Sequence, residues 1–160
     1  FHLVDTHSDP SVGVRHAVEF NDRGIHMIVG AARSAVSGPV ALVSGLSDTP
    51  VLSYSSTAAV LGTSTYPMFS RVIPNDDLPA FSLIKVCQEL GWLSVAMIFI
   101  DDSYGQGYAS SVQNYAAGQG IDIVAAPSFT TGDAGSINTA VQGVKESGAR
   151  VIFCITFAQD

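Results

Sequence analysis

A cluster of hydroxyl side chains follows a short apolar segment in the first half of the chain. Val51 and Leu52 have the β-branched and apolar character of a buried strand. The hydroxyl residues that come directly after them are Ser53, Ser55, Ser56 and Thr57. Ligands of open α/β sheets bind outside the carboxyl ends of the strands, so hydroxyls and backbone N–H groups at this position suit a small polar ligand. Capping of the following turn is an equally good interpretation of the same residues.

A glycine and a serine frame a second stretch with similar chemistry, at residues 30–34. Gly30 ends an apolar segment that is expected to be a strand, and it permits a tight turn into a helix. The N-terminus of that helix would direct N–H groups and the positive end of its dipole at an anion, and Ser34 would add a hydroxyl. An N-cap role for Ser34 is the alternative. The stretch lacks the full glycine pattern of a dinucleotide fold and the lysine of a phosphate loop.

Composition limits the classes of partner. The chain has 160 residues, of which 47% are hydrophobic and 13% are charged, and its formal net charge is -7. This length fits one large domain or two small ones, and the negative charge argues against nucleic acid or an anionic membrane surface as a partner. The longest apolar run, Val95–Ile100, is far too short to cross a bilayer.

The other residues with chemical potential form no recognisable catalytic or metal pattern. Asp101 and Asp102 at the end of an expected strand could hold Mg²⁺ in an enzyme built on a doubly wound sheet. The sequence has, however, no phosphate loop, nucleophile motif or His–carboxylate–Ser arrangement. Cys87 and Cys154 lack metal spacing and lie among apolar residues, which favours buried free thiols. The histidines, also without metal-ligand spacing, are His2, His7, His16 and His26. No metal or cofactor is therefore expected.

Strand-like segments alternate with helix-like segments along the chain. Strands are expected at residues 1–4, 25–29, 51–52, 68–73, 93–100, 121–125 and 151–156. Helices are expected from 10 to the turn at 21–24, over about 35–46, from the break at 74–77 to 91, and over about 107–117 and 136–147. Residues 62–67 and 129–133 are expected to be loops. The alternation predicts parallel sheets with helices on both faces, and the break at Pro74 divides the elements into two such sheets.

Several short motifs, taken in order, resemble a known family. They are His7–Pro10, Ile28–Gly30, Pro39–Ala41, Thr49–Thr57, Tyr66–Asp76, Gly91–Trp92 and Asp101–Gly105. Each is weak alone, but their order and spacing over nearly the whole chain are similar to the type I periplasmic-binding-protein fold, or Venus-flytrap domain. This group includes the branched-chain amino-acid binding proteins of bacteria. It also includes the ectodomains of class C G-protein-coupled receptors and natriuretic-peptide receptors.

The resemblance implies an α/β, bilobed fold in which parallel sheets are flanked by helices, with residues 1–73 in lobe 1 and residues 74–160 in lobe 2. It implies a sequence incomplete at both ends, because the family has an earlier strand–helix unit and a C-terminal part that returns to both lobes. The implied function is extracellular or periplasmic capture of a small amino-acid-like ligand between the lobes, for receptor signalling or transport, without catalysis. A homodimer through the lobe 1 helices and membrane attachment only through segments outside this sequence belong to the same expectation.

The resemblance also assigns ligand-binding positions in lobe 1. Ser34 matches a serine that binds the ligand carboxylate. Ser55 and Thr57 match a pair that holds the carboxylate and the amino group, with Ser56 offering backbone groups between them. Arg33 departs from the family pattern, in which a small or polar residue is usual. It either contacts an acidic side chain of the ligand or is simply solvated.

In lobe 2 the resemblance points to an acid and an aromatic ring. Asp76 and Tyr104 match residues that contact the ligand, and a carboxylate and a ring face both suit an ammonium group. An N-cap role for Asp76 and packing at a helix start for Tyr104 are the alternatives. Arg71, which precedes the crossover between lobes, is expected to have a structural role. A degenerate flytrap module that binds protein instead of a small molecule is the alternative function.

Overall fold

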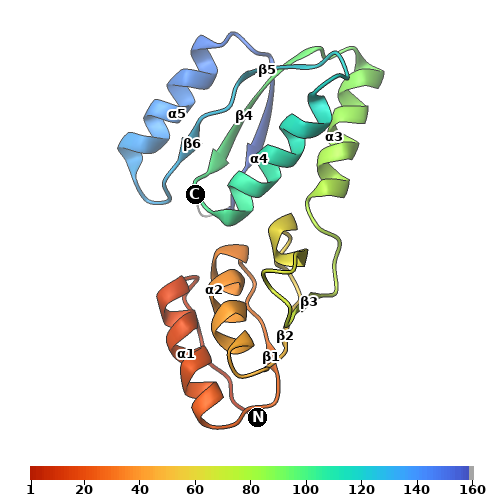
Figure 1. Cartoon of the computed structure of the whole chain (residues 1–160). Coiled ribbons are helices and arrows are strands. Elements are labelled where there is room, and N and C mark those ends of the chain that lie inside the picture. The colour runs from red at the N-terminus through yellow and green to blue at the C-terminus, as the bar shows by residue number, and fades with distance from the viewer. Residues whose placement is uncertain (159–160) are drawn as a thin grey trace. The chain divides into compact units, whose positions relative to one another are not determined.

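The computed structural model describes residues 1–158 and divides the chain into two units, Phe1–Asn75 and Asp76–Asp160. The division falls close to the break expected at Pro74. Each unit is an α/β arrangement with its own parallel sheet (Figure 1). No helix within residues 1–158 is both long and apolar enough to cross a membrane.

The first unit contains a three-stranded sheet with two helices packed on it. Its elements are α1 (Pro10–Asp22), β1 (Ile28–Val29), α2 (Ser34–Gly45), β2 (Val51–Ser53), the 3-10 helix η1 (Ala59–Gly62) and β3 (Phe69–Arg71). The strands lie in the order β1-β2-β3 and pair in parallel. In Figure 1, α1 and α2 lie side by side next to this sheet.

Local sequence explains where α1 begins and how closely it approaches α2. Asp9 caps α1 by accepting a hydrogen bond of 2.7 Å from the backbone N–H of Ser11, and Pro10 occupies the first helical position. This confirms the helix start expected from the sequence. A Cβ atom added to Gly13 would lie 2.6 Å from Cγ1 of Val36, so the contact between the two helices requires glycine at this position.

The core of the first unit lies between the helices and one face of the sheet. The register pairs Ile28 with Val51 and Val51 with Phe69, so these side chains share a face. The buried helix residues that pack in the same cluster are Ala17, Val36, Val40 and Ala41. This packing fixes the position of the N-terminus of α2 beside the carboxyl ends of β1 and β2.

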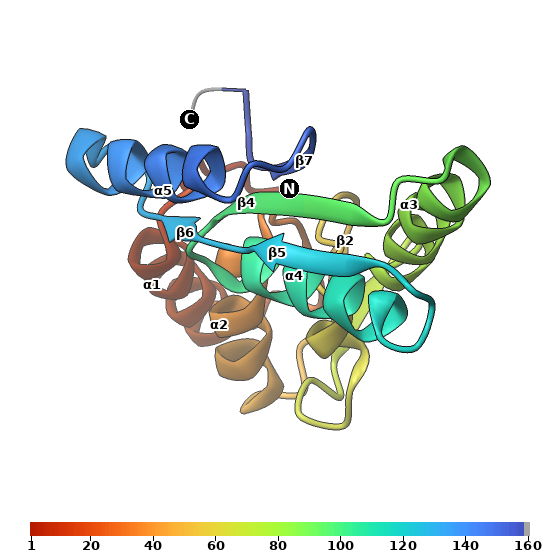
Figure 2. The same ribbon diagram turned by 90° about the horizontal axis from the view of Figure 1, so that it is seen from above.

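The second unit has helices on both faces of a four-stranded parallel sheet. Its elements are α3 (Asp77–Leu90), β4 (Ser94–Ile100), α4 (Ser103–Ala116), β5 (Asp122–Ala125), β6 (Ser128–Phe129), α5 (Ala134–Glu146) and β7 (Val151–Ile155). The central strand is β4, which pairs with β7 along one edge and with β5 and β6 along the other. Figure 2 shows α4 and α5 on opposite sides of β4.

Alternation along β4 explains the two helical layers. Val95 and Met97 point into the cluster formed with α3 and α4, whereas Ile100 packs with Phe129 and with Ala140 of α5. Successive side chains of a strand point to opposite faces, so an apolar strand buried on both sides reads as a continuous apolar run. The apolar run Val95–Ile100 noted in the sequence therefore lies in the central strand of this unit.

The structure corrects two expectations about strands. Residues 1–4 were expected to form a strand, but they pair with no strand among the described residues, and Phe1 and Leu3 are fully exposed. Without a hydrogen-bonded neighbour the segment stays irregular. Phe129 was expected in a loop, but it pairs with Ile100 in β6 and is buried. Two residues are too few to show the periodicity of a strand.

Two further expectations change in the second unit. The helix expected from Gly107 begins at Ser103, because Asp102 accepts hydrogen bonds from the first-turn N–H groups and caps it. Both cysteines are free thiols within the described residues. Cys87 is buried as expected, but Cys154 on β7 is exposed, so its apolar sequence neighbours were a poor guide to its burial.

Candidate functional site

The two hydroxyl-bearing stretches of the first unit meet at the carboxyl end of its sheet. Val29 pairs with Leu52 in the parallel ladder, and the backbone N–H of Gly30 donates to the carbonyl of Leu52 at 2.9 Å. The chain then turns at Gly30, whose φ of 139° favours glycine. As a result the loop that leads into α2 and the loop that follows β2 lie next to each other.

Ser34 is the first residue of α2, and its hydroxyl does not cap that helix. The N-cap position belongs to Arg33, whose side chain makes no capping hydrogen bond. The Ser34 Oγ instead accepts a hydrogen bond of 3.1 Å from the backbone N–H of Ala58, in the loop after β2. Within residues 1–158 the proton of the Ser34 hydroxyl has no acceptor. The N-cap interpretation of Ser34 is therefore wrong.

The hydroxyls after β2 fall into two groups. Ser55 is exposed and Thr57 is half-buried, and within the described chain their side-chain oxygens make no hydrogen bond. Ser53 and Ser56 are fully buried and bonded to neighbouring groups of the fold. Ser56 also uses its backbone: its N–H donates to Ser53 Oγ at 2.9 Å, and its carbonyl accepts from Arg71. Ser56 therefore supports the loop, whereas Ser55 and Thr57 present hydroxyls.

Arg71 has the structural role that was expected for it. It lies on β3, and its guanidinium donates from Nη1 to the carbonyls of Ser56 at 3.2 Å and Ala58 at 2.9 Å. A cationic donor fixes two carbonyls of the loop after β2. Arg33, by contrast, is half-buried next to Ser34, and both interpretations of its side chain stay open.

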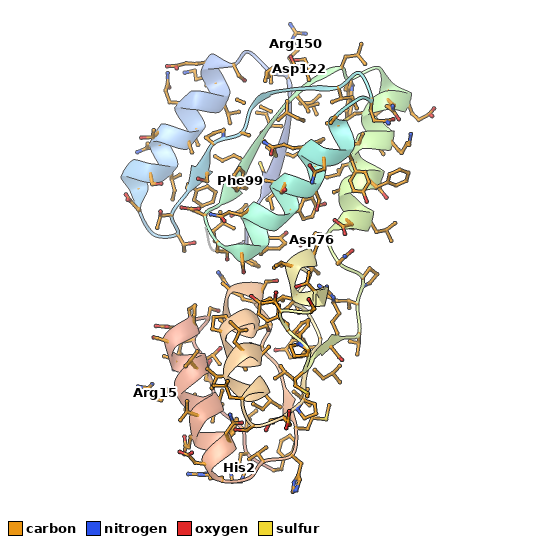
Figure 3. All side chains as sticks on the ribbon, in the orientation of Figure 1. His2, Arg15, Asp76, Phe99, Asp122 and Arg150 are labelled. Atoms are coloured by element: carbon orange, nitrogen blue, oxygen red, sulfur yellow. The ribbon has the colours of Figure 1, made fainter. Side chains whose placement is uncertain are left out.

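In the second unit Asp76 lies at the N-terminal end of α3 (Figure 3). Asp76 is the N-cap residue of α3, as the alternative interpretation expected, but the residue is only 2% exposed and its side chain makes no capping hydrogen bond to the helix. The carboxylate lies near two phenols of α4. The pKa of Tyr104 is raised above its usual value by burial and then by the charge of Asp76, and the same two causes raise the pKa of Tyr108.

Tyr104 stands at the start of α4 within an aromatic cluster. Its backbone N–H donates to Asp102 at 2.9 Å. Its ring centroid lies 6.1 Å from that of Tyr108, edge to face, and 5.1 Å from that of Phe157. The sequence did not single out Tyr108, although its spacing of four from Tyr104 places both on one face of a helix. Packing therefore accounts for part of the environment of Tyr104.

The acidic pair at the end of β4 serves local structure. Asp102 accepts hydrogen bonds from the N–H groups of Tyr104 and Gly105, both at 2.9 Å, and Asp101 accepts one of 2.6 Å from the Gln106 amide. Residues 1–158 contain no group of three His, Cys, Asp or Glu side chains that could hold a metal ion. Both carboxylates therefore already bind groups of the fold at the start of α4.

A cavity in the first unit borders the loops that carry the hydroxyls. Its volume is about 740 Å³, and its walls come from residues 1–8, α1, residues 25–32, Val40 of α2 and Tyr54 in the loop after β2. Ser34, Ser55 and Thr57 are not among its lining residues. The predicted residues thus form two sets: Arg33, Ser34 and residues 55–57 in the first unit, and Asp76 with Tyr104 in the second.

Comparisons with known proteins agree with one another. The family model described as the receptor family ligand binding region matches residues 1–160. Metabotropic glutamate receptor-like protein E of Dictyostelium discoideum is 34% identical over 100 residues, which are 62% of this chain and 12% of that protein. Metabotropic glutamate receptor 6 of Oryctolagus cuniculus is 41% identical over 80 residues, 49% of this chain and 9% of that protein.

A taste receptor is among the similar proteins. Taste receptor type 1 member 1 of Homo sapiens is 35% identical over 75 residues, 46% of this chain and 9% of that protein. The chain therefore spans only 9% to 12% of the length of these three relatives.

Proposed function

The chain belongs to the family of receptor ligand-binding regions, and on this premise we propose that its ligand is a free α-amino acid or a close analogue. The observation that carries the proposal is the set of three hydroxyls, Ser34, Ser55 and Thr57, at the meeting carboxyl ends of β1 and β2. Within residues 1–158 their protons have no acceptor, although the backbone N–H groups of Ser55 and Ala58, in the loop after β2, are hydrogen-bonded to Ser53 and Ser34.

A carboxylate fits this set of groups. Hydroxyl donors and the N-terminus of α2, which no side chain caps, would stabilise a negative charge. Charge-assisted hydrogen bonds of this kind are stronger than bonds between neutral groups. Ser34, Ser55 and Thr57 would therefore bind the carboxylate end of the ligand, and Ser56 would hold the loop that carries two of them.

An ammonium group fits the residues of the second unit. Asp76 supplies a carboxylate and Tyr104 a ring face, and both attract a cation. A molecule with a carboxylate and an ammonium group a short distance apart is an α-amino acid. Capture of one ligand by both residue sets, as the bilobed resemblance implies, is part of this proposal.

Arg33 bears on the choice among amino acids. A guanidinium beside Ser34 would favour a ligand with a second carboxylate on its side chain. Two of the similar proteins carry glutamate, an acidic amino acid, in their names. We therefore include a contact between Arg33 and an acidic ligand side chain in the proposal. The same premise suggests an extracellular receptor role, binding without turnover, and a homodimer through α1 and α2.

The proposal is tested on the intact protein by thermal shift, followed by calorimetry. The panel consists of the L-amino acids, acetate and succinate as simple carboxylates, glucose, and adenosine. Stabilisation by one or more amino acids is expected, and preference for L-glutamate and L-aspartate over L-alanine would support the Arg33 contact. A response to glucose or adenosine alone would refute an amino-acid ligand and leave the family assignment intact. A lack of any response would favour a module that binds protein.

A further inference from the structure

Three buried serines of the first unit surround the carbonyl groups at residues 31 and 32. Ser37 comes from α2, Ser53 from the end of β2, and Ser56 from the loop after it, and the exposed fraction of each is 0%. The Oγ atoms of Ser37, Ser53 and Ser56 lie 3.2, 2.7 and 3.3 Å from the carbonyl oxygen of Ala31. Segments that are far apart in the sequence thus meet at one point.

Ser53 uses all of its hydrogen-bonding capacity in this arrangement. Its hydroxyl donates to the Ala31 carbonyl at 2.7 Å, and its oxygen accepts from the backbone N–H groups of Ser55 at 3.2 Å and Ser56 at 2.9 Å. A hydroxyl offers one proton and two lone pairs, so Ser53 is saturated. It links the loop before α2 to the loop after β2 in a single step.

Ser37 and Ser56 complete the link. Their Oγ atoms are 2.7 Å apart. If Ser37 donates to Ser56, the Ser56 proton goes to the Ala32 carbonyl at 3.2 Å. If Ser56 donates to Ser37, the Ser37 proton goes to the Ala31 carbonyl at 3.2 Å. With either donor, one proton lies between the two hydroxyls and the other is donated to a carbonyl of residue 31 or 32. Replacing Ser37 or Ser56 by alanine therefore breaks the same connection between α2 and the loop after β2.

We infer that Ser37, Ser53 and Ser56 form a positioning network that fixes the spacing between Ser34 and the Ser55–Thr57 hydroxyls. The inference rests on the proposed function. The network binds the carbonyls of Ala31 and Ala32, and Ser34 follows them as the first residue of α2. Ser55 and Thr57 are the two neighbours of Ser56 in the sequence. Buried polar groups that are mutually satisfied make a region rigid. Ser56, assigned to the ligand by resemblance, is on this inference a positioning residue.

Ser44 provides a matched comparison on the same helix. It is also a buried serine of α2, with an exposed fraction of 0%, but its Oγ makes no hydrogen bond within residues 1–158. A general effect of removing a buried hydroxyl from α2 would therefore appear in Ser44→Ala as well. An effect of the network appears only in Ser37→Ala and Ser56→Ala.

The first arm of the test measures affinity in the intact protein. We compare Ser37→Ala, Ser56→Ala, the double variant and Ser44→Ala by calorimetry, with L-glutamate and L-alanine as probes, well below the unfolding temperature. Each network variant is expected to raise the Kd about 3- to 10-fold, the range for losing one net hydrogen bond. The double variant should be no worse than about the larger single effect, because both break one connection. Ser44→Ala should leave the Kd unchanged.

The second arm needs no ligand. Amide hydrogen exchange at Ser55 and Ser56 is expected to be at least about 3-fold faster in Ser37→Ala than in the wild type, while exchange in α1 stays the same. Unchanged exchange at both amides would overturn the network, and so would an equal loss of affinity in Ser44→Ala. If the wild type binds no amino acid at all, the proposed function fails, and the exchange result alone decides whether the network exists.

Discussion

Three hydroxyls of the first unit stand apart from the other buried or half-buried serines and threonines around them. The Ser34 hydroxyl accepts a hydrogen bond from the Ala58 N–H but donates none within the described residues. The Ser55 and Thr57 hydroxyls make no hydrogen bond within the same residues. Sequence reasoning found these residues, because small hydroxyls after a strand are visible in a sequence. It could not separate them from Ser53 and Ser56, since the partners of those two lie about 20 residues away.

The hydroxyls that donate no hydrogen bond within the described residues should matter for ligand binding. Ser34→Ala and Thr57→Ala in the intact protein are each expected to weaken binding of the amino acid selected by the screen by about 1–3 kcal/mol, the cost of leaving a polar group of the ligand unpaired. Calorimetry measures this loss. Urea unfolding should show only a small change for Thr57→Ala, whereas Ser34→Ala also leaves the buried Ala58 N–H without its acceptor and should cost about 1–3 kcal/mol of stability. Unchanged affinity in both variants would mean that the carboxylate is bound elsewhere.

The charge of Asp76 should be visible in the titration of two tyrosines. Burial first, and then this charge, raise the pKa of Tyr104 and Tyr108 above the usual 10.0. Asp76→Asn is expected to lower both, measured by the absorbance of tyrosinate. Asp77→Asn, which removes the same charge one position later, is the control and should have less effect. If Asp76→Asn leaves the pKa values of both tyrosines unchanged, the charge of Asp76 does not contribute to the shift.

The same shift sets the direction of a pH effect on stability. The fold favours the neutral phenols, so their contribution is fully present below the ordinary phenol pKa near 10. As the pH rises above that value the unfolded chain ionises first, and the free energy of unfolding of the second unit falls.

At the scale of elements, two glycines in helices of the second unit have opposite roles. A Cβ atom at Gly105 would lie 2.0 Å from the carbonyl oxygen of Ile100, so the first turn of α4 can approach the end of β4 only with glycine. A Cβ atom at Gly143 in α5 would make an ordinary contact of 3.8 Å with Pro127. The space around each glycine therefore decides whether an alanine substitution stabilises or destabilises the protein.

We expect Gly105→Ala to destabilise the protein by at least about 3 kcal/mol, because a backbone atom cannot move aside as a side chain does. Gly143→Ala should instead stabilise it by about 0.5–1 kcal/mol, the helix preference of alanine over glycine. Urea unfolding of the intact protein measures both. A Gly105→Ala variant as stable as the wild type would show that α4 packs less closely than described.

Helices were predictable where their ends carry chemical signals. Asp9 and Pro10 indicate the start of α1, and Gly91, with a φ of 68°, ends α3 as expected. The start of α4 was placed too late, although Asp102 is a strong N-cap residue, because glycines at 105 and 107 made the first turn look like a loop. β6 was missed because its pairing with β4 depends on a contact distant in sequence.

For the whole molecule, the two residue sets belong to different units, so the proposed carboxylate contact and the proposed ammonium contact can be tested independently. Ser34→Ala should weaken binding of amino acids and of simple carboxylates alike, since both carry the group that Ser34 is proposed to contact. Asp76→Asn should weaken only amino acids, by about 10-fold or more, because an acetate or succinate ion has no ammonium to lose.

Calorimetry with the best amino acid and with succinate distinguishes these outcomes. Equal losses for both probes in Asp76→Asn would indicate that Asp76 supports the fold and does not contact an ammonium group. The family assignment explains why the sequence predicted the architecture so fully: its short motifs mark turns and caps, which are local. The contacts that these motifs make with distant segments of their own unit, such as those of Ser53 and Ser56 with residues 31 and 32, could not be read from the motifs themselves.

The contrast between the two cysteines allows the second unit to be labelled at one chosen thiol. Cys87 is buried, and burial raises the pKa of its thiol, so it has little reactive thiolate at neutral pH. Cys154 is exposed on β7. A maleimide dye would therefore attach to a single position of this stretch of chain, without any engineered cysteine. A fluorescent reporter placed there would follow the second unit alone and needs no change to the hydroxyls of the first.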